Sequence, residues 1–258
     1  MFKKMLFTAM LLSAVLSITS YAGQWELSDR GWRYRNDDGT YAAGGWLGDQ
    51  ATGYFYRMDG NGYMITGWWT PAQESGIWYY LNPANSGIAI PEGALVGGAN
   101  VEGYQIAADG LWKNGAVLQK AVDENTKQLL DKTGYDLRSV YDYCATKIPY
   151  VWSSWSSQDG TNTFAELGYL NGTGNCYTMA AIFCKAAKAL GYDCRQMAGY
   201  VPGKNGKMLP HSWCEITIDG QTRVYDPDFT YETGRDGYGI SYGQKGTWMY
   251  RDYAEMPQ

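Results

Sequence analysis

A cysteine at the start of a predicted helix is the residue best placed for nucleophilic chemistry. Cys176 follows Asn175, a residue type favoured at helix N-caps, in the segment G-N-C-Y-T-M-A-A-I-F-C-K-A-A-K-A-L of residues 174–190. Free N–H groups and the positive end of the helix dipole favour a thiolate in the first turn. The single histidine, His211, and a carboxylate at Asp226 follow in that order. The sequence therefore predicts a thiol acyl-transfer site.

A predicted hairpin brings the histidine close to a carboxylate. Asp219-Gly220 is a strong signal for a two-residue turn between strands. If the residues flanking that turn pair with each other, His211 faces Asp228 and is a diagonal neighbour of Asp226. The register alone therefore leaves both carboxylates as candidate partners of the imidazole.

Short motifs around these residues resemble the transglutaminase-like family of papain-type thiol enzymes, from the helix capped by Asp136 to Phe229. The residues that carry the resemblance are Gly174-Asn175-Cys176, Ala187, Leu190, Gly191, Gly199-Tyr200, His211-Ser212-Trp213-Cys214-Glu215 and Asp226-Pro227. By this resemblance Cys176 is the nucleophile, His211 the base and Asp226, rather than Asp228, the orienting acid. For the oxyanion, the candidate donors are the side chains of Tyr150 and Trp152 and the backbone N–H of Cys176, of which we favour the last.

Such a site forms a thioester from an amide or peptide bond. Resolution by water makes the enzyme a peptidase or amidase, and resolution by an amine makes it a cross-linking transglutaminase; the sequence favours neither. A papain-type amidase acting on peptidoglycan stem peptides is a further alternative, as is a degenerate, non-catalytic domain in a wall-binding protein. We expect no cofactor and no metal, since the calcium-like start Asp59-Gly60-Asn61-Gly62 lacks the later ligands and a single histidine argues against zinc.

Helical periodicity predicts an α+β domain of transglutaminase-like, papain-like fold over residues 116–258. One helix is expected over 117–132, and a second follows the Asp136 cap. Its apolar stripe is Leu137, Val140, Tyr141, Cys144 and Ile148. The pattern Thr163-x-x-Glu166 predicts a capping box for a short helix ending near Leu170. Strands are expected at 194–201, 211–218 and 221–226, and an edge strand within 246–253.

Residues 23–115 predict a different architecture, an all-β solenoid of aromatic hairpins. Tryptophan and tyrosine recur at intervals of 14 and 22 residues, and the clearest unit is a hairpin running from Gly53 through the turn at 59–62 to Trp68. These units resemble the choline- and glucan-binding repeats of bacterial cell-wall proteins. The resemblance implies cages for a choline-substituted or other wall glycan, with Trp32, Trp46, Tyr54, Tyr56, Trp68, Trp78 and Tyr80 as the candidate ligand-binding residues.

The remaining features concern the localisation and the partners of the protein. Residues 1–22 have the charged start, apolar run and small-residue end of a cleaved secretory signal, after which no membrane span is expected. Cleavage takes the net charge from −5 to −7, which argues against nucleic acid as a partner. We expect a protein secreted to the bacterial surface, with a protein or peptide substrate. Disulfide pairing among Cys144, Cys184, Cys194 and Cys214 stays open.

Overall fold

The computed structural model describes residues 23–151, 159–203 and 205–258. The predicted signal at 1–22 and the oxyanion candidate Trp152 lie outside this part of the chain. The described residues form two compact units. The first holds the residues up to Gln73 together with Ile77–Asn114, and the second holds Glu74–Gly76 with Gly115–Gln258. No helix in the described ranges is long and apolar enough to cross a membrane.

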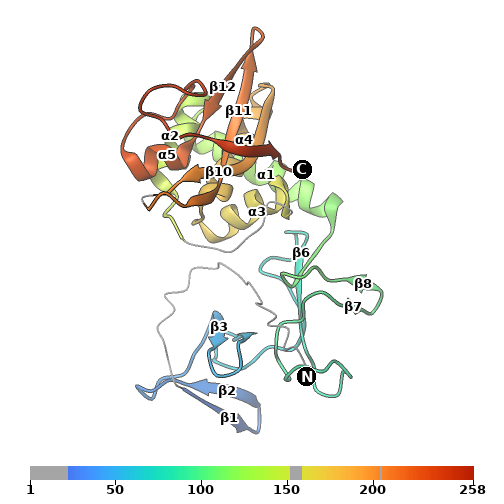
Figure 1. Cartoon of the computed structure of the whole chain (residues 1–258). Helices are drawn as coiled ribbons and strands as arrows, with labels where there is room; N and C mark the ends of the chain where they lie inside the picture. Colours follow the sequence, from blue (N-terminus) through green and yellow to red (C-terminus); the bar gives the residue numbers. More distant parts are fainter. Residues whose placement is uncertain (1–22, 152–158, 204) are drawn as a thin grey trace, which may run out of the picture. The chain divides into compact units, whose positions relative to one another are not determined.

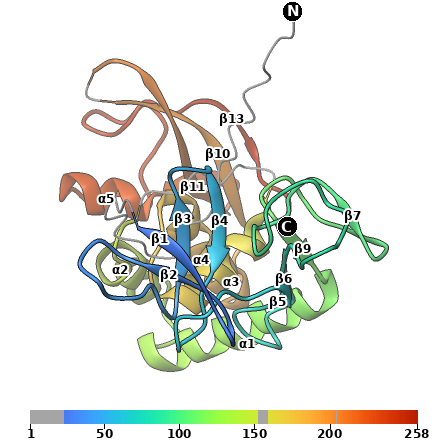
Figure 2. The same ribbon diagram turned by 90° about the horizontal axis from the view of Figure 1, so that it is seen from below.

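The first unit is rich in short antiparallel β-hairpins. Its strands are β1 (Gln24–Ser28), β2 (Gly31–Arg35), β3 (Trp46–Asp49), β4 (Tyr54–Arg57), β5 (Gly67–Trp69), β6 (Ile77–Leu81), β7 (Asn100–Val101), β8 (Tyr104–Gln105) and β9 (Leu111–Lys113). They pair as β1–β2, β3–β4, β5–β6–β9 and β7–β8. The hairpins β1–β2 and β3–β4 lie side by side (Figures 1 and 2), and Trp25 and Tyr56 meet edge to face between them.

The predicted hairpin across residues 59–62 forms only next to its turn, where the N–H of Asp59 donates to the carbonyl of Tyr63 and the N–H of Ile65 donates to that of Arg57. The bridge between Met58 and Met64 lies between these two bonds, but the pairing extends no further: β4 forms its ladder with the preceding strand β3, and β5 pairs with β6. The Asp59 carboxylate accepts hydrogen bonds from the N–H groups of Asn61 and Tyr63, which closes a tight local turn. The N–H of Met64 points away from β4 and donates to the carbonyl of Trp32 at 2.8 Å, so the chain after the turn also bonds to β2.

The second unit packs five helices with a four-stranded antiparallel sheet of order β12-β11-β10-β13 (Figure 1). Its helices are α1 (Gly115–Thr133), α2 (Leu137–Lys147), α3 (Thr161–Asn171), α4 (Cys176–Ala189) and α5 (Pro227–Thr233). Its strands are β10 (Cys194–Pro202), β11 (Met208–Ile218), β12 (Gln221–Tyr225) and β13 (Arg251–Glu255). The α+β content expected for this part of the chain is thus present, including the edge strand, which pairs with β10.

Helix α4 is the centre of this unit. It contacts β10, β11 and all four other helices, and every residue from Cys176 to Ala187 is buried. A helix that is covered on all sides is held by packing rather than by its own propensity. The position of its first residue, Cys176, is therefore fixed by the core of the domain.

The register predicted for the β11–β12 hairpin is confirmed. Ile218 pairs with Gln221, and the ladder continues to Cys214 and Tyr225. Asp219 has a positive φ of 51° and Gly220 one of 75°, as the two-residue hairpin turn requires. The strand ends before Pro227, as expected, because the chain turns there into α5.

The predicted capping box at Thr163 and Glu166 is wrong. Helix α3 begins earlier, at Thr161, whose N–H donates to the carbonyl of Pro257, and Gly160 at the N-cap has a φ of 82°. Glu166 is therefore inside the helix and only 1% exposed, where its carboxylate accepts a hydrogen bond from Asn125. Burial raises the pKa of Glu166 to about 7, although the Asn125 bond opposes the shift.

Replacing Glu166 with glutamine is expected to stabilise the protein above pH 7. A carboxyl whose pKa is raised on folding keeps a proton that the unfolded chain releases, so its folding cost grows as pH rises from about 4.5 to about 7. Glutamine carries no charge and can still accept from Asn125. Urea unfolding should show Glu166→Gln more stable by about 1 to 3 kcal/mol at pH 8 and unchanged at pH 4.5. An equal difference at both pH values would contradict this explanation.

All five cysteines are free and buried. Cys144 lies on α2. The sulfur atoms of Cys184, Cys194 and Cys214 lie within 4.8 Å of one another where α4 packs on β10 and β11. The Cys184 thiol donates to the carbonyl of Cys194, and the Cys214 thiol donates to that of Ala180. These four cysteines act as small core residues, while Cys176 alone begins a helix.

Candidate active site

The turn before α4 holds Cys176 at the first position of the helix. The Asn175 side chain accepts hydrogen bonds from the N–H groups of Tyr177 and Thr178 at 3.0 and 3.3 Å, which is the predicted N-cap. A side chain at Gly174 would collide with Thr178, since a Cβ there would lie 2.3 Å from it. Cys176 is 5% exposed. Cap and glycine together place its thiol at the positive end of the helix dipole.

His211 and Asp226 form the buried pair that the hairpin predicted. The Nε2 atom of His211 lies 2.8 Å from Oδ2 of Asp226, and both side chains are almost fully buried. The Asp226 carboxylate also accepts hydrogen bonds from the Tyr250 hydroxyl at 2.8 Å and from the N–H of Phe229 at 3.0 Å. It therefore caps α5 and holds the imidazole at the same time. The Tyr141 hydroxyl, donating to the carbonyl of Asp226, fixes the main chain.

The surroundings of His211 favour its charged form. Burial by itself lowers the pKa of the imidazole. The rings of Trp213 and Trp248 contribute to that burial, with their centroids 5.9 and 4.8 Å from the centroid of the imidazole. The charge of Asp226 and its hydrogen bond outweigh this effect, with a smaller contribution from Cys176, and raise the pKa of His211 well above its usual value. A histidine held in this way can stabilise a neighbouring thiolate.

Cys176 and a second carboxylate lie on the other side of the imidazole. Single ligand atoms of Cys176, His211 and Asp228 all lie within 4.8 Å of one another. The Nδ1 atom of His211 is 3.5 Å from Oδ2 of Asp228. Because Nε2 is bonded to Asp226, Nδ1 is the nitrogen left to face the thiol. Asp226 makes the closer contact with the imidazole, but Asp228 is part of the same cluster.

Tyr150 also reaches this cluster. Its backbone bridges to Gly174, and the N–H of Val151 donates to the carbonyl of Gly174 at 2.8 Å. Burial raises the pKa of the Tyr150 hydroxyl, and so do the neighbouring Cys176 and Asp228. The segment at Tyr150 therefore contacts both the turn at Gly174 and the thiol of Cys176.

Residues 119–227 match the family model of the transglutaminase-like superfamily, and this range includes Cys176, His211 and Asp226. The second unit contains a transglutaminase-like domain. A comparison with curated proteins gives no significant match.

Solved structures similar to the chain include wall-binding and enzyme folds. The choline binding domain of Spr1274 from Streptococcus pneumoniae is 27% identical, covering 35% of this chain and 93% of its own, with a TM-score of 0.27. A TGase is 16% identical, covering 50% of this chain and 36% of its own, with a TM-score of 0.36. A candidate cysteine protease from Cytophaga hutchinsonii is 14% identical, covering 55% and 47%, with a TM-score of 0.36. The chain thus spans less than half the length of the last two.

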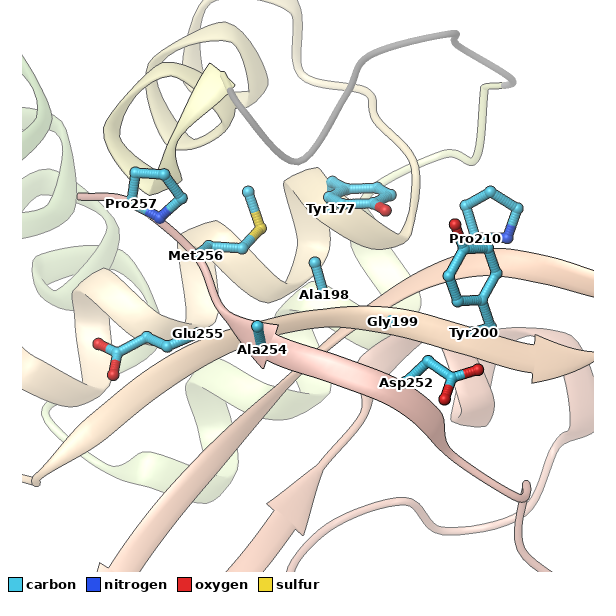
Figure 3. Close-up of a pocket in the computed structure, with 10 residues that line it drawn as sticks. All are labelled: Tyr177, Ala198, Gly199, Tyr200, Pro210, Asp252, Ala254, Glu255, Met256 and Pro257. Atoms are coloured by element: carbon cyan, nitrogen blue, oxygen red, sulfur yellow. The ribbon is translucent and has the colours of Figure 1, made fainter.

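A pocket of about 380 Å³ in the transglutaminase-like domain is lined by sequence neighbours of Cys176 and His211, but by neither of these two residues. One wall is Tyr177, which follows Cys176, and another is Pro210, which precedes His211. Figure 3 shows Tyr177 over the β10 residues Ala198 and Gly199, with Tyr200 and Pro210 at one end and Met256 and Pro257 at the other. Asp252 and Glu255 of β13 are the acidic residues of its lining.

Two residues of this domain were not found by sequence reasoning. Tyr250 bonds Asp226 from a Gly- and Tyr-rich tail that carries no motif, so only its contact identifies it. Trp248 packs edge to face on His211 from the same tail. A signal for either residue would require knowing that β13 returns to pair with β10.

The predicted ligand-binding aromatics of the first unit fall into separate groups. Trp46 contacts Trp69 and Tyr79, and the guanidinium of Arg57 lies 4.5 Å from the Trp69 ring and 5.9 Å from that of Trp46. Tyr56 meets Trp25. The other predicted residues are placed by single contacts: the Trp32 N–H donates to Glu92, Tyr54 pairs with Asp49, and Trp78 pairs with Trp112.

Trp68 and Tyr80 belong to the group that we call the Trp68 cluster, made of Trp68, Tyr80, Tyr104 and Trp112. Tyr104 is 45% exposed, so one side of this cluster is open to solvent. The Trp68 N–H donates to the Glu102 carboxylate at 3.0 Å, which places a negative charge at the cluster. Aromatic faces beside a carboxylate suit a cation or a sugar ring.

Proposed function

We propose that this protein is a secreted, wall-associated thiol enzyme that transfers acyl groups from amide or peptide bonds. The observation that supports this best is the meeting of three differently placed residues. Cys176 starts the central helix, His211 lies within 4.8 Å of it, and Asp226 holds the far side of the imidazole at 2.8 Å. Nucleophile, base and orienting acid are the parts that such chemistry requires.

The Cys176 thiolate attacks the carbonyl carbon, and a C–S bond forms. His211 gives the proton on Nδ1 to the nitrogen of the leaving amine, and the C–N bond breaks to leave a thioester. Water or a second amine then attacks the thioester, passes a proton to His211 and restores the thiolate. Asp226 keeps the imidazole in the tautomer and orientation that these transfers need.

The oxyanion donors in this proposal are the backbone N–H of Cys176 and the Tyr150 hydroxyl. Both groups belong to segments that meet at Gly174 beside the thiol. The pocket lined by Tyr177 and Pro210, which neighbour Cys176 and His211 in the sequence, is proposed to hold part of the substrate. Its mixed lining of two tyrosines and two acidic residues fits a peptide.

The test of the activity compares two substrates. Purified wall peptide and a glutamine-containing protein are each incubated with the enzyme and a labelled primary amine. Release of a new amino terminus or of ammonia without label identifies a hydrolase, and incorporation of label identifies a transglutaminase. Turnover should disappear in Cys176→Ala. If neither substrate reacts and Cys176 has no unusual reactivity, the alternative of a non-catalytic domain on a wall-binding protein replaces the proposal.

The hairpin repeats are proposed to stack as a solenoid that holds the enzyme to a wall polymer, choline-substituted or another glycan. The Trp68 cluster is the favoured site because it is open, whereas Arg57 already occupies the faces at Trp46 and Trp69. The guanidinium of Arg57 forms no ion pair within the described residues, and its Nε has no hydrogen-bond partner. At these rings the Arg57 guanidinium therefore takes the place that a cationic ligand would occupy.

Replacing Tyr104 with alanine is expected to weaken binding to the wall polymer about 10-fold, as the loss of a ring from an aromatic site costs about 1 to 2 kcal/mol. Affinity is measured on immobilised choline and on a choline-free glycan, which tells the two ligand classes apart. Tyr135→Ala, which removes an exposed tyrosine from the other unit, serves as the control. Unchanged binding of Tyr104→Ala to both materials would exclude the Trp68 cluster as the site.

A further inference from the structure

Asp228 is a buried carboxylate that the proposed mechanism does not use. It is 4% exposed and lies in the first turn of α5, two residues after Asp226. Its Oδ2 is 3.5 Å from Nδ1 of His211, and its Oδ1 is buried without a hydrogen-bond partner in the described part of the chain. A buried and unpartnered carboxylate oxygen is costly, so it calls for an explanation in a site of this kind.

The position of Asp228 makes it a competitor of the thiol. Cys176 and Asp228 both lie beside the same ring nitrogen of His211, while Asp226 occupies the other one. When Asp228 is a neutral carboxyl, the proton on Nδ1 of His211 bonds to the Cys176 thiolate and is then transferred to the leaving amine. As a carboxylate, it accepts that proton in a hydrogen bond and adds a negative charge where the oxyanion forms.

We propose that Asp228 is a positioning residue that sets the upper pH limit of the enzyme. Its neutral carboxyl allows turnover, and its carboxylate inhibits turnover. This inference rests on the proposed function, because it concerns the same thiol and imidazole. Asp228 forms no covalent bond to the substrate; as the pH rises, the O–H bond of its carboxyl breaks and the proton passes to solvent.

The charges around Asp228 agree with a transition near neutrality. Burial raises the pKa of Asp228 to about 7; the charge of His211 opposes the shift, while those of Asp226 and Glu232 add to it. The other titratable groups that face it are Cys176 on α4 and the Tyr150 hydroxyl. Tyr150 stays neutral over this range because burial raises its pKa, so it adds no charge.

Asp228→Asn tests the inference, since asparagine keeps the shape of the neutral carboxyl and cannot ionise. The alkylation rate of Cys176 by iodoacetamide and the turnover of the substrate are followed from pH 5 to 9. We expect equal turnover of variant and wild type at pH 6. At pH 8.5, where about 3% of a carboxyl with a pKa of 7 is neutral, turnover of the wild type should be lower by up to about 30-fold.

A second measurement needs no substrate. His211 is the only histidine, so ¹⁵N-histidine labelling gives the two ring-nitrogen signals of a single imidazole. The Nδ1 shift of the wild type should show a step near pH 7 as its partner ionises, and Asp228→Asn should lack it. Glu232→Gln, which removes an exposed carboxylate from the same helix, should keep the step.

The outcomes separate this inference from the proposed function. If Cys176 has no enhanced reactivity but the Nδ1 step is present and is lost in Asp228→Asn, the proposed function fails and the coupling of Asp228 to His211 stands. If Cys176 is reactive and Asp228→Asn leaves both the alkaline limit and the Nδ1 step unchanged, the role of Asp228 is overturned.

Discussion

Replacing Asp226 with alanine is expected to lower the free energy of unfolding by about 3 to 5 kcal/mol. The carboxylate is fully buried and serves His211, Tyr250 and the N–H of Phe229 together. Its loss leaves Nε2 of His211 and the Tyr250 hydroxyl without the partner that they share and removes the cap of α5. Urea unfolding of both proteins at pH 7 measures the difference.

The matched control is Asp226→Asn, which keeps an oxygen for the cap of α5 but no charge for His211. We expect it to lose less stability than Asp226→Ala and still to lose turnover by about a thousand-fold or more, because the imidazole is no longer held in the productive tautomer. If Asp226→Asn retained the turnover of the wild type, Asp226 would be a structural cap only.

Replacing His211 with alanine is expected to slow alkylation of Cys176 at pH 6 on the order of 100-fold. A cysteine without a charged partner has a pKa of about 8.5, so well under 1% of it is thiolate at pH 6. The imidazolium that Asp226 maintains favours the thiolate in the wild type. Peptide mass spectrometry after timed treatment with iodoacetamide gives the rate at each cysteine.

The four other cysteines provide the internal control in both proteins. They are buried in the core, and none lies beside the histidine in the described residues. Their labelling should be slow and equal in the wild type and in His211→Ala. Faster labelling of all five in the variant would indicate unfolding, and the comparison is then repeated with His211→Gln, whose larger side chain preserves more of the packing.

The site could be predicted to the extent that local signals determine it. Asn175 and Cys176 indicate a helix start by residue type alone. The turn Asp219-Gly220 fixes a strand register that continues to Tyr225. Both carboxylates near His211 followed from that register. The meeting of Cys176 with His211 is a tertiary contact between α4 and β11, and it was anticipated by the order of the residue types and by the family resemblance, not by a local signal.

What the sequence did not predict depends on distant contacts. Tyr250 reaches Asp226 because β13 pairs with β10, a connection over about fifty residues with no local signature. Likewise, α3 begins at Thr161 because its N–H finds the carbonyl of Pro257 at the far end of the chain, which overrides the capping pattern. In the repeats, β4 pairs with β3 and β5 pairs with β6, so periodicity located the strands but not all of their partners.

The central claim is that Cys176 is a nucleophile activated by His211. Its most direct test is the alkylation rate of Cys176 in the mature wild-type protein as a function of pH, resolved by peptide mass spectrometry. We expect rapid alkylation that persists well below pH 8.5, the pKa of a free cysteine, and that disappears in His211→Ala. A Cys176 that is unreactive, or that titrates as an ordinary thiol in both proteins, would contradict the claim.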